Sequence, residues 1–391
     1  MKNIGTMKQI LTVLVTVGVA AAAHSQIEIT EKIVPGNTPP IWVSMSGFTG
    51  EAAQVLQFDL YVQGFNFTNA EGAQYLISGS NNGNLQGRAT DRFNKNVLVA
   101  KAYSGASLRR QAHAFADDFV RALGRKGIAE TKIAFKGENG RTSEIYVADF
   151  DGHNPQAVTR DNSIVAAPCW VPGRMALYYT SYKLNHPDIF YQNVSSGERR
   201  IFARYGGSNI SPAASPNGDE VAMILSKDGW TDLYVGRAAG GKPTRLTTSR
   251  QDESSPCWSP DGRWICYASK DRERRSLSKI SAAGGESQRI PISLGANPTE
   301  PDWSPDGQWI AFTAQYRDFQ ICVIKAGGGE ATTLVAGEDP SWAPNSRTLV
   351  FARRVGGGRY VLSLLDVPTK QVKDVPRISG SASQSQPSWA R

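Results

Sequence analysis

The fold is decided by residues 254–267, SSPCWSPDGRWICY, because the chain contains six variants of this stretch. A second clear copy is PDWSPDGQWIAF at residues 301–312. The tryptophan position recurs at steps of 44, 44, 45, 39 and 47 residues, and it is occupied by Trp170, Ala214, Trp258, Trp303, Trp342 and Trp389. A period in the forties with turn residues at a fixed phase is typical of the blades of a β-propeller. The repeats therefore predict a mainly β chain with a six-bladed β-propeller.

The turn Ser259-Pro260-Asp261-Gly262 explains why each copy joins two strands tightly. Proline supplies the fixed φ of the turn, aspartate bonds back to the backbone, and glycine accepts a positive φ. The extended Pro-x-Trp before the turn is expected to line the propeller axis, and the apolar run after it is expected to form the next strand outward. The tryptophans are interpreted as core residues packed between neighbouring blades.

Counting strands predicts how the ring closes. The first blade has strands from Lys132 onward with no Pro-x-Trp before them, whereas the chain ends on Pro387-Ser388-Trp389. The last strand is therefore expected to be the innermost strand of the first blade. This closure leaves no exposed edge strand in the ring.

The predicted organisation is a secretory signal peptide at residues 1–25, an α/β domain at 26–128 and the propeller at 129–391. The leader has Lys2 and Lys8, an apolar run, and small residues before cleavage after Ser25. No later stretch approaches the roughly 20 apolar residues of a membrane span, so the exported chain is predicted to have no integral membrane segment.

Local patterns predict the elements of the α/β domain. Residues 26–34 alternate as a strand, and residues 51–63 and 108–123 have helical periodicity, with Ser107 as an N-cap. Three further strands are expected at residues 74–79, 84–91 and 96–103.

Charge and cysteine content narrow the class of protein. Without Lys2 and Lys8 the formal charge falls from +8 to +6, which is compatible either with a patch for an acidic partner or membrane surface, or with simple solubility. Basic aromatic motifs for nucleic acid are absent. Cys257 and Cys266 flank one turn and form either a cross-strand disulfide or two buried thiols; the cysteine spacings predict no metal site and no cofactor.

The sequence resembles the TolB family of periplasmic propeller proteins in the Tol-Pal envelope system. The resemblance rests on WSPDG at 258–262 and 303–307, EIYVADFDG at 144–152, RQAHAFADD at 110–118 and TKIAF at 131–135. Departures are Ala214, the diluted turn at 343–346 and a loose fit at 37–51.

This resemblance implies a periplasmic binding protein that supports outer-membrane integrity and cell division. The propeller mouth would dock the peptidoglycan-associated lipoprotein Pal, and the mature N-terminal segment would engage TolA. Carried onto this chain, that segment is Gln26, Ile27, Glu28, Ile29, Thr30, Glu31 and Ile33. Its alternating apolar pattern suits strand addition to a partner sheet, and equally suits an edge strand of its own domain.

The mouth itself is predicted from propeller geometry, since the loops between fourth and first strands and those between second and third strands emerge on one face. The first loop class forms an expected inner ring of Asn162, Ser208, Asn209, Asp252, Glu253, Thr299, Glu300, Glu338 and Asp339. The second forms an expected basic outer ring of Lys183, Lys227, Lys270, Arg272, Arg274, Arg275, Arg317, Arg353 and Arg354. The arrangement favours a partner-binding surface, although single exposed charges are ordinarily just solvated.

An enzyme is the alternative, namely a propeller acting on envelope carbohydrate or peptidoglycan with Asp252, Glu253, Glu300 and Asp339 paired across the mouth. No Gly-x-Ser-x-Gly motif occurs. His113 is expected either to pack in the helix interface or to make a polar contact with Asp117 on its own helix, rather than to act in catalysis. The sequence thus predicts a binding protein that is not an enzyme.

Overall fold

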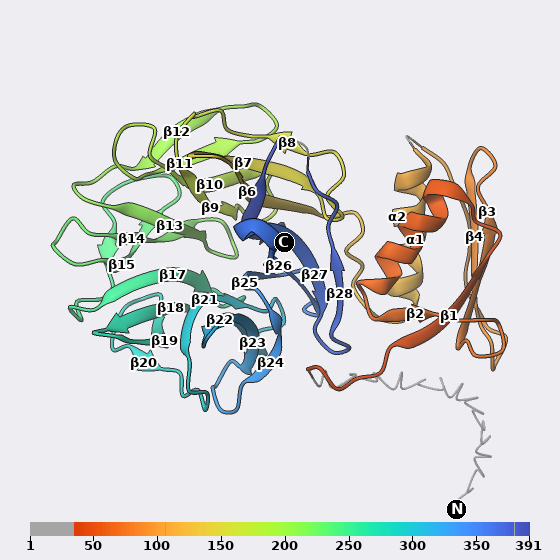
Figure 1. The fold of residues 1–391 in the computed structure, drawn as a ribbon. Coiled ribbons are helices and arrows are strands. Elements are labelled where there is room, and N and C mark those ends of the chain that lie inside the picture. The colour runs from red at the N-terminus through yellow and green to blue at the C-terminus, as the bar shows by residue number, and fades with distance from the viewer. Residues whose placement is uncertain (1–34, 106, 379) are drawn as a thin grey trace, which may run out of the picture. The chain divides into compact units, whose positions relative to one another are not determined.

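The six repeated stretches each begin a four-stranded antiparallel sheet, and the sheets are arranged around a common axis (Figure 1). The computed structural model describes residues 35–105, 107–378 and 380–391. The predicted leader, the predicted strand at 26–34 and the predicted N-terminal partner segment lie outside these residues.

Six propeller sheets are present within the described chain, which confirms the predicted fold class. Their second to fourth strands follow the turns and polar loops that the sequence indicated. In chain order the strands of the first three blades are β6 (Lys132–Asn139), β7 (Thr142–Asp149) and β8 (Gln156–Ala157); β9 (Val165–Trp170), β10 (Ala176–Ser181), β11 (Asp188–Asn193) and β12 (Arg199–Ala203); β13 (Asn209–Ala214), β14 (Glu220–Leu225), β15 (Asp232–Arg237) and β16 (Thr244–Arg245). Those of the other three are β17 (Asp252–Trp258), β18 (Trp264–Asp271), β19 (Arg274–Ser281) and β20 (Gln288–Arg289); β21 (Asn297–Trp303), β22 (Trp309–Gln315), β23 (Phe319–Lys325) and β24 (Thr332–Ala336); β25 (Glu338–Trp342), β26 (Thr348–Val355), the short 3-10 helix η1 (Gly356–Gly358), β27 (Arg359–Asp366) and β28 (Gln371–Asp374).

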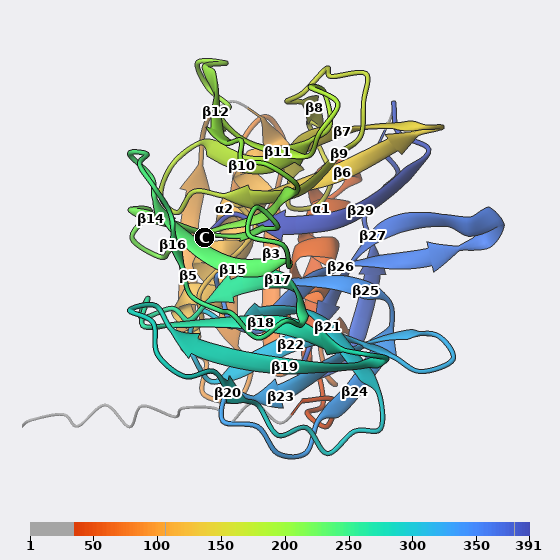
Figure 2. The same ribbon diagram turned by 90° about the vertical axis from the view of Figure 1, so that its left-hand side faces the viewer.

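The last strand, β29 (Ser383–Trp389), closes the ring as the sequence predicted. It is the innermost strand of the first blade, whose order is β29-β6-β7-β8, and Figure 2 shows blue β29 beside yellow β6. Trp389 pairs with Ile133 and Ser383 with Glu138 in an antiparallel register. Two segments from opposite ends of the propeller sequence are thereby joined by backbone hydrogen bonds.

Every innermost strand carries the same backbone irregularity three residues before the tryptophan position. The register with the second strand shifts there in all six blades, which marks a β-bulge that re-aims the chain. The bulge residues are non-glycine yet have φ between 49° and 57°: Ala167, Ser211, Ser255, Glu300, Asp339 and Gln386. A proline follows each one, and because proline lacks an N–H it leaves no unpaired donor on the inner edge of the sheet. These prolines are Pro168, Pro212, Pro256, Pro301, Pro340 and Pro387.

The tryptophans pack between blades, as expected. Trp342 is completely buried and Trp389 is 2% exposed. Three of the Nε1 groups donate to a backbone oxygen of the neighbouring blade: Trp258 to Ala213 O at 2.9 Å, Trp170 to Ser388 O at 3.0 Å and Trp342 to Asp302 O at 3.1 Å. Burial of the large rings and satisfaction of their single donors together hold adjacent blades at a fixed spacing.

A five-stranded sheet covered by two helices precedes the propeller. Its order is β2-β1-β3-β4-β5, with β1 parallel to both neighbours. Helix α2 begins at the predicted N-cap, because Ser107 Oγ accepts from Arg110 N at 3.3 Å. The sequence missed β1 and β2. The elements are β1 (Ile41–Ser46), α1 (Gly50–Tyr61), β2 (Phe65–Phe67), β3 (Tyr75–Ser80), β4 (Leu85–Asp91), β5 (Val97–Tyr103) and α2 (Leu108–Ala122).

Candidate functional site

The propeller mouth is the face on which the fourth-to-first and second-to-third loops emerge. The register of the fourth blade places Asp252 on β17 opposite Lys270 on β18, and Lys270 opposite Arg275 on β19. One row across three strands therefore runs from an inner acid to outer bases.

The inner-ring residues differ greatly in exposure. Asn162 and Asp252 are exposed, while Ser208, Thr299, Glu300, Glu338 and Asp339 are half-buried. Asn209 and Glu253 are buried. Only part of the predicted inner ring is therefore accessible to a partner.

The two buried members hold their own loops in place. Asn209 Oδ1 accepts from Tyr205 N at 2.8 Å, and its Nδ2 donates to Pro187 O at 3.2 Å. Glu253 Oε2 accepts from Leu233 N at 2.9 Å, and burial raises the pKa of Glu253 to about 7. Their place in the mouth is structural, because a side chain that satisfies buried donors is not available to a partner.

Glu300, Asp339 and Gln386 form a hydrogen-bonded series around the channel wall. Asp339 N donates to Glu300 Oε2 at 3.2 Å, and Gln386 N donates to Asp339 Oδ2 at 3.0 Å. The series continues from Ala167 N to Gln386 Oε1 at 3.0 Å. Burial, followed by the nearby Glu300 carboxylate, raises the pKa of Asp339 well above its usual value. These side chains satisfy the bulge N–H of the next blade, which gives both carboxylates a structural role.

Local acids already pair with three residues of the basic outer ring. Lys227 Nζ lies 2.7 Å from Asp228 Oδ2, Lys183 lies 3.5 Å from Asp161, and Arg353 pairs with Asp374. Arg272, Arg274, Arg317 and Arg354 are exposed, and Lys270 and Arg275 are half-buried. The β18–β19 hairpin, with Arg272 at its tip, is the densest basic part of the mouth.

The same loops expose large apolar side chains that the sequence analysis did not single out. Trp230 is 47% exposed, Tyr316 43% and Tyr182 39%, all in second-to-third loops. Ile164 in a fourth-to-first loop and Phe319 at the start of β23 are also exposed. In the sequence, these residues could have been found as bulky apolar side chains inside loops that were expected to be polar. Aromatic anchors within a polar rim are typical of protein-binding surfaces.

The other end of the channel contains a cavity of about 640 Å³. Its lining runs from the bulge residues to the turn prolines Pro172, Pro216, Pro260 and Pro305. Arg391 donates to Trp342 O and Trp303 O, both at 3.2 Å, and pairs with Asp302. This end of the channel is thus bordered by proline rings and crossed by one arginine, in contrast to the charged and aromatic mouth.

His113 pairs with a carboxylate on the neighbouring helix rather than with one on its own helix. Of the two alternatives for His113, packing is confirmed, because the ring is buried, and the polar contact with Asp117 is wrong. His113 Nδ1 lies 2.7 Å from Asp59 Oδ2, and Asp117 Oδ1 instead accepts from Ala129 N at 2.9 Å. Asp117 is one helical turn from His113 on α2, but His113 pairs with Asp59 on α1 instead. The sequence pattern of a single helix gives no information about a partner on another helix.

The cysteines are thiols. Cys257 and Cys266 lie directly opposite each other on β17 and β18, and both are free and buried. Cys322 is also free and buried, and Cys169 is free and half-buried. Residues 35–105, 107–378 and 380–391 contain no group of three His, Cys, Asp or Glu side chains placed to hold a metal ion. In the same residues no helix is long and apolar enough to cross a membrane.

Comparison with known proteins agrees with this architecture. The family described as TolB beta propeller domain matches residues 119–391. The chain is 31% identical over 307 residues to the Tol-Pal system protein TolB of Bordetella pertussis, covering 75% of this chain and 70% of that protein. The corresponding protein of Bordetella bronchiseptica is also 31% identical over 307 residues, with 75% and 69% covered.

A solved structure gives the same fold over nearly the whole chain. The crystal structure of TolB from Acinetobacter baumannii superposes with a TM-score of 0.81 at 20% identity, covering 92% of this chain and 98% of that one. At that identity the likeness speaks for the fold alone. The sequence matches go further: this chain belongs to the TolB family and is a propeller component of the Tol-Pal system.

Proposed function

We propose that this protein is a periplasmic adaptor of the Tol-Pal system, binding partners without catalysing a reaction. Its propeller mouth docks a Pal-like peptidoglycan-associated lipoprotein, and its mature N-terminal segment, residues 26–33, engages a TolA-like inner-membrane protein. Through these contacts it supports outer-membrane integrity and cell division.

The mouth proposal is carried by one observation: exposed aromatic side chains occur in the same loop class as the basic β18–β19 hairpin. Trp230 and Tyr316 offer rigid apolar area, which commonly dominates the free energy of protein association. Arg272 and Arg274 offer positive charge, which steers the encounter with an acidic surface. We infer an acidic partner surface with an apolar centre.

A binding role also accounts for the carboxylates that an enzyme would need. Glu300 and Asp339 accept backbone hydrogen bonds from the following blades, and Glu253 is committed to Leu233 N. These three carboxylates therefore accept hydrogen bonds that hold the fold together. Incubation with cell-wall fragments, read by mass spectrometry, should therefore detect no turnover, whereas a pull-down should recover an outer-membrane lipoprotein.

The decisive experiment measures association of the full chain with a purified Pal-like lipoprotein domain. Reversing Arg272, Arg274 and Arg275 to glutamate should lower the association rate constant at low salt, with a smaller effect at high salt as screening grows. The matched control reverses Arg174, Lys242 and Arg263, which are exposed in turns at the opposite ends of the strands. Equal slowing by both sets, or by neither, would contradict a mouth that steers its partner.

The N-terminal proposal needs a separate measurement. Removal of residues 26–33 should abolish binding to a TolA-like domain while leaving lipoprotein binding and thermal stability unchanged. A fall in stability without loss of TolA binding would instead indicate that the segment is an edge strand of its own domain.

A further inference from the structure

The turn between β7 and β8 joins the propeller to the two helices. Phe150 in this turn is completely buried. Its ring lies 5.9 Å from that of Phe58 on α1 and 5.7 Å from that of His113 on α2, measured between centroids. One residue of the first blade therefore packs against both helices of the α/β layer.

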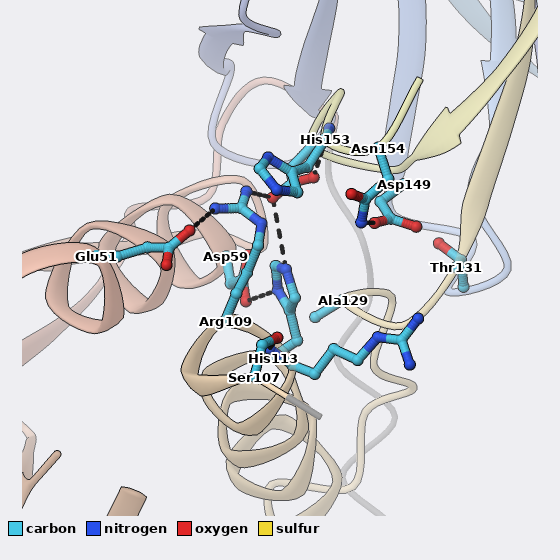
Figure 3. Close-up of polar contacts among 12 residues, drawn as sticks. Glu51, Asp59, Ser107, Arg109, His113, Ala129, Thr131, Asp149, His153 and Asn154 are labelled. Carbon is cyan, nitrogen blue, oxygen red and sulfur yellow. Dashed lines mark hydrogen bonds and ion pairs between the residues drawn. The ribbon is translucent and has the colours of Figure 1, made fainter. Parts of the chain in front are cut away.

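His113 also belongs to a buried ionic cluster, whose polar contacts are drawn in Figure 3. His113 Nδ1 lies 2.7 Å from Asp59 Oδ2, and His113 Nε2 lies 3.5 Å from Asp151 Oδ2. The three residues are 5%, 0% and 3% exposed. Asp59 belongs to α1, whereas Asp151 belongs to the propeller turn, so the imidazole sits between carboxylates of two separate structural layers.

The other charged groups facing the cluster are few. Arg109 on α2 pairs with Asp151 and, at 3.1 Å, with Glu51 on α1. Asp149 on β7 pairs with Lys132 and also interacts electrostatically with His113. Asp117 on α2 interacts electrostatically with Asp59: burial raises the pKa of Asp59, and the negative charge of Asp117 raises it further. The two negative charges of Asp59 and Asp151 need two positive charges to balance them. Arg109 supplies one, and His113 supplies the other only when both of its ring nitrogens are protonated.

The number of N–H donors on the His113 ring, and with it the charge balance of the cluster, depends on a single proton. An imidazolium has two N–H donors, so it can face Asp59 and Asp151 at once; a neutral imidazole has one and leaves the other carboxylate opposite a lone pair. A buried carboxylate without a compensating partner is strongly destabilising. Loss of the proton should therefore weaken the contact between the helices and the turn.

We propose that His113 is a proton-dependent lock that fastens the α/β layer to the first propeller blade through Asp59 and Asp151. Acidification tightens the contact, and mildly alkaline conditions loosen it. The inference goes beyond the proposed partner binding and does not depend on the identity of any partner.

The directions of the pKa shifts agree with the geometry. Burial lowers the pKa of His113, but the charge and hydrogen bond of Asp59, with Asp151, outweigh it and raise the pKa above 6.5. Burial raises the pKa of Asp59 to about 6, and burial also raises that of Asp117. A raised His113 pKa gives a stabilisation that is complete below 6.5 and is lost as pH rises through the folded-state value. The raised Asp59 pKa acts in the same direction between about 4 and 6.

The test follows the lock in the full chain by hydrogen–deuterium exchange from pH 6 to 8.5, corrected for the intrinsic pH dependence of exchange. Protection of the amides in the 150–153 turn and at the end of α1 should fall, about tenfold for each unit by which the His113 pKa exceeds its ordinary value. His113→Gln should flatten this profile. Asp59→Asn should shift the loss of protection to lower pH, since it removes the main group that raises the His113 pKa.

His153→Gln is the control, because His153 is exposed in the same turn and its contact with Asp151 is made through its backbone N–H. This variant should keep the wild-type profile. Titration of the His113 ring in the wild-type protein by NMR gives a result that requires no variant to fold. A His113 pKa at or below 6.5, or identical exchange profiles in wild type and His113→Gln, would overturn the proposal.

Discussion

The indole Nε1 of Trp389 donates a 2.8 Å hydrogen bond to Thr131 Oγ1, a residue 258 positions earlier in the chain. The same indole lies 6.4 Å from the Phe150 ring, measured between centroids. The strand that closes the ring therefore also buttresses the turn against which the helices pack.

Deletion of residues 386–391 should destabilise the protein far more than its length suggests. The deletion removes Trp389 and the part of β29 nearest the turn, leaving β6 with an open edge. Trp389→Ala alone should cost about 3–5 kcal/mol, the usual range for a buried tryptophan. Trp389→Phe should cost less, because the apolar contact is largely kept. Denaturant unfolding monitors all three, and a truncated protein with an unchanged midpoint would refute closure by β29.

Arg347→Ala should cost about 3–5 kcal/mol, because it leaves the buried Asp366 carboxylate without its main counter-charge. Arg347 Nη2 lies 3.0 Å from Asp366 Oδ2, and the two residues are 6% and 0% exposed. Arg263→Ala is the matched control, since that arginine pairs with Asp261 in an exposed turn and should cost no more than about 1 kcal/mol. Similar unfolding free energies for the two variants would contradict the assignment.

Trp230→Ala should raise the dissociation rate constant of a Pal-like partner roughly 30-fold, the equivalent of losing an aromatic anchor worth about 2 kcal/mol. Trp42→Ala is the comparison, because Trp42 is similarly exposed but lies on β1. Surface plasmon resonance distinguishes the two. The anchor assignment fails if Trp230→Ala leaves dissociation unchanged.

Glu253→Gln should change the free energy of unfolding more favourably at pH 8 than at pH 5. The folded-state pKa of Glu253 is raised by burial to about 7 from 4.5. Between these values the folded protein binds more protons than the unfolded chain, so the free energy of unfolding falls as pH rises, by at most roughly 3 kcal/mol for this group. Urea unfolding at the two pH values measures the difference. An equal effect of the substitution at both would contradict the raised pKa.

Some of this architecture follows from short-range information in the sequence. The proline, aspartate and glycine of each turn act within four residues, and the apolar periodicity of α2 acts within two helical turns, so both could be recognised without knowledge of their neighbours. The ring closure followed because a missing innermost strand at one end matched a surplus one at the other. The strand β1 was missed because its pairing is parallel, with partners from β2 and β3 that no local turn announces.

The sequence by itself determined six sheets, their order and the strand that seals them, because turn chemistry and strand periodicity are local properties of the chain. Only the tertiary structure decided that Asn209 and Glu253 are buried while Trp230 is exposed, and that His113 faces Asp59 and Asp151 rather than Asp117. Burial and ionic pairing depend on which segments meet in space. Those meetings are set by the packing of the whole chain, so no pattern within one element contains them.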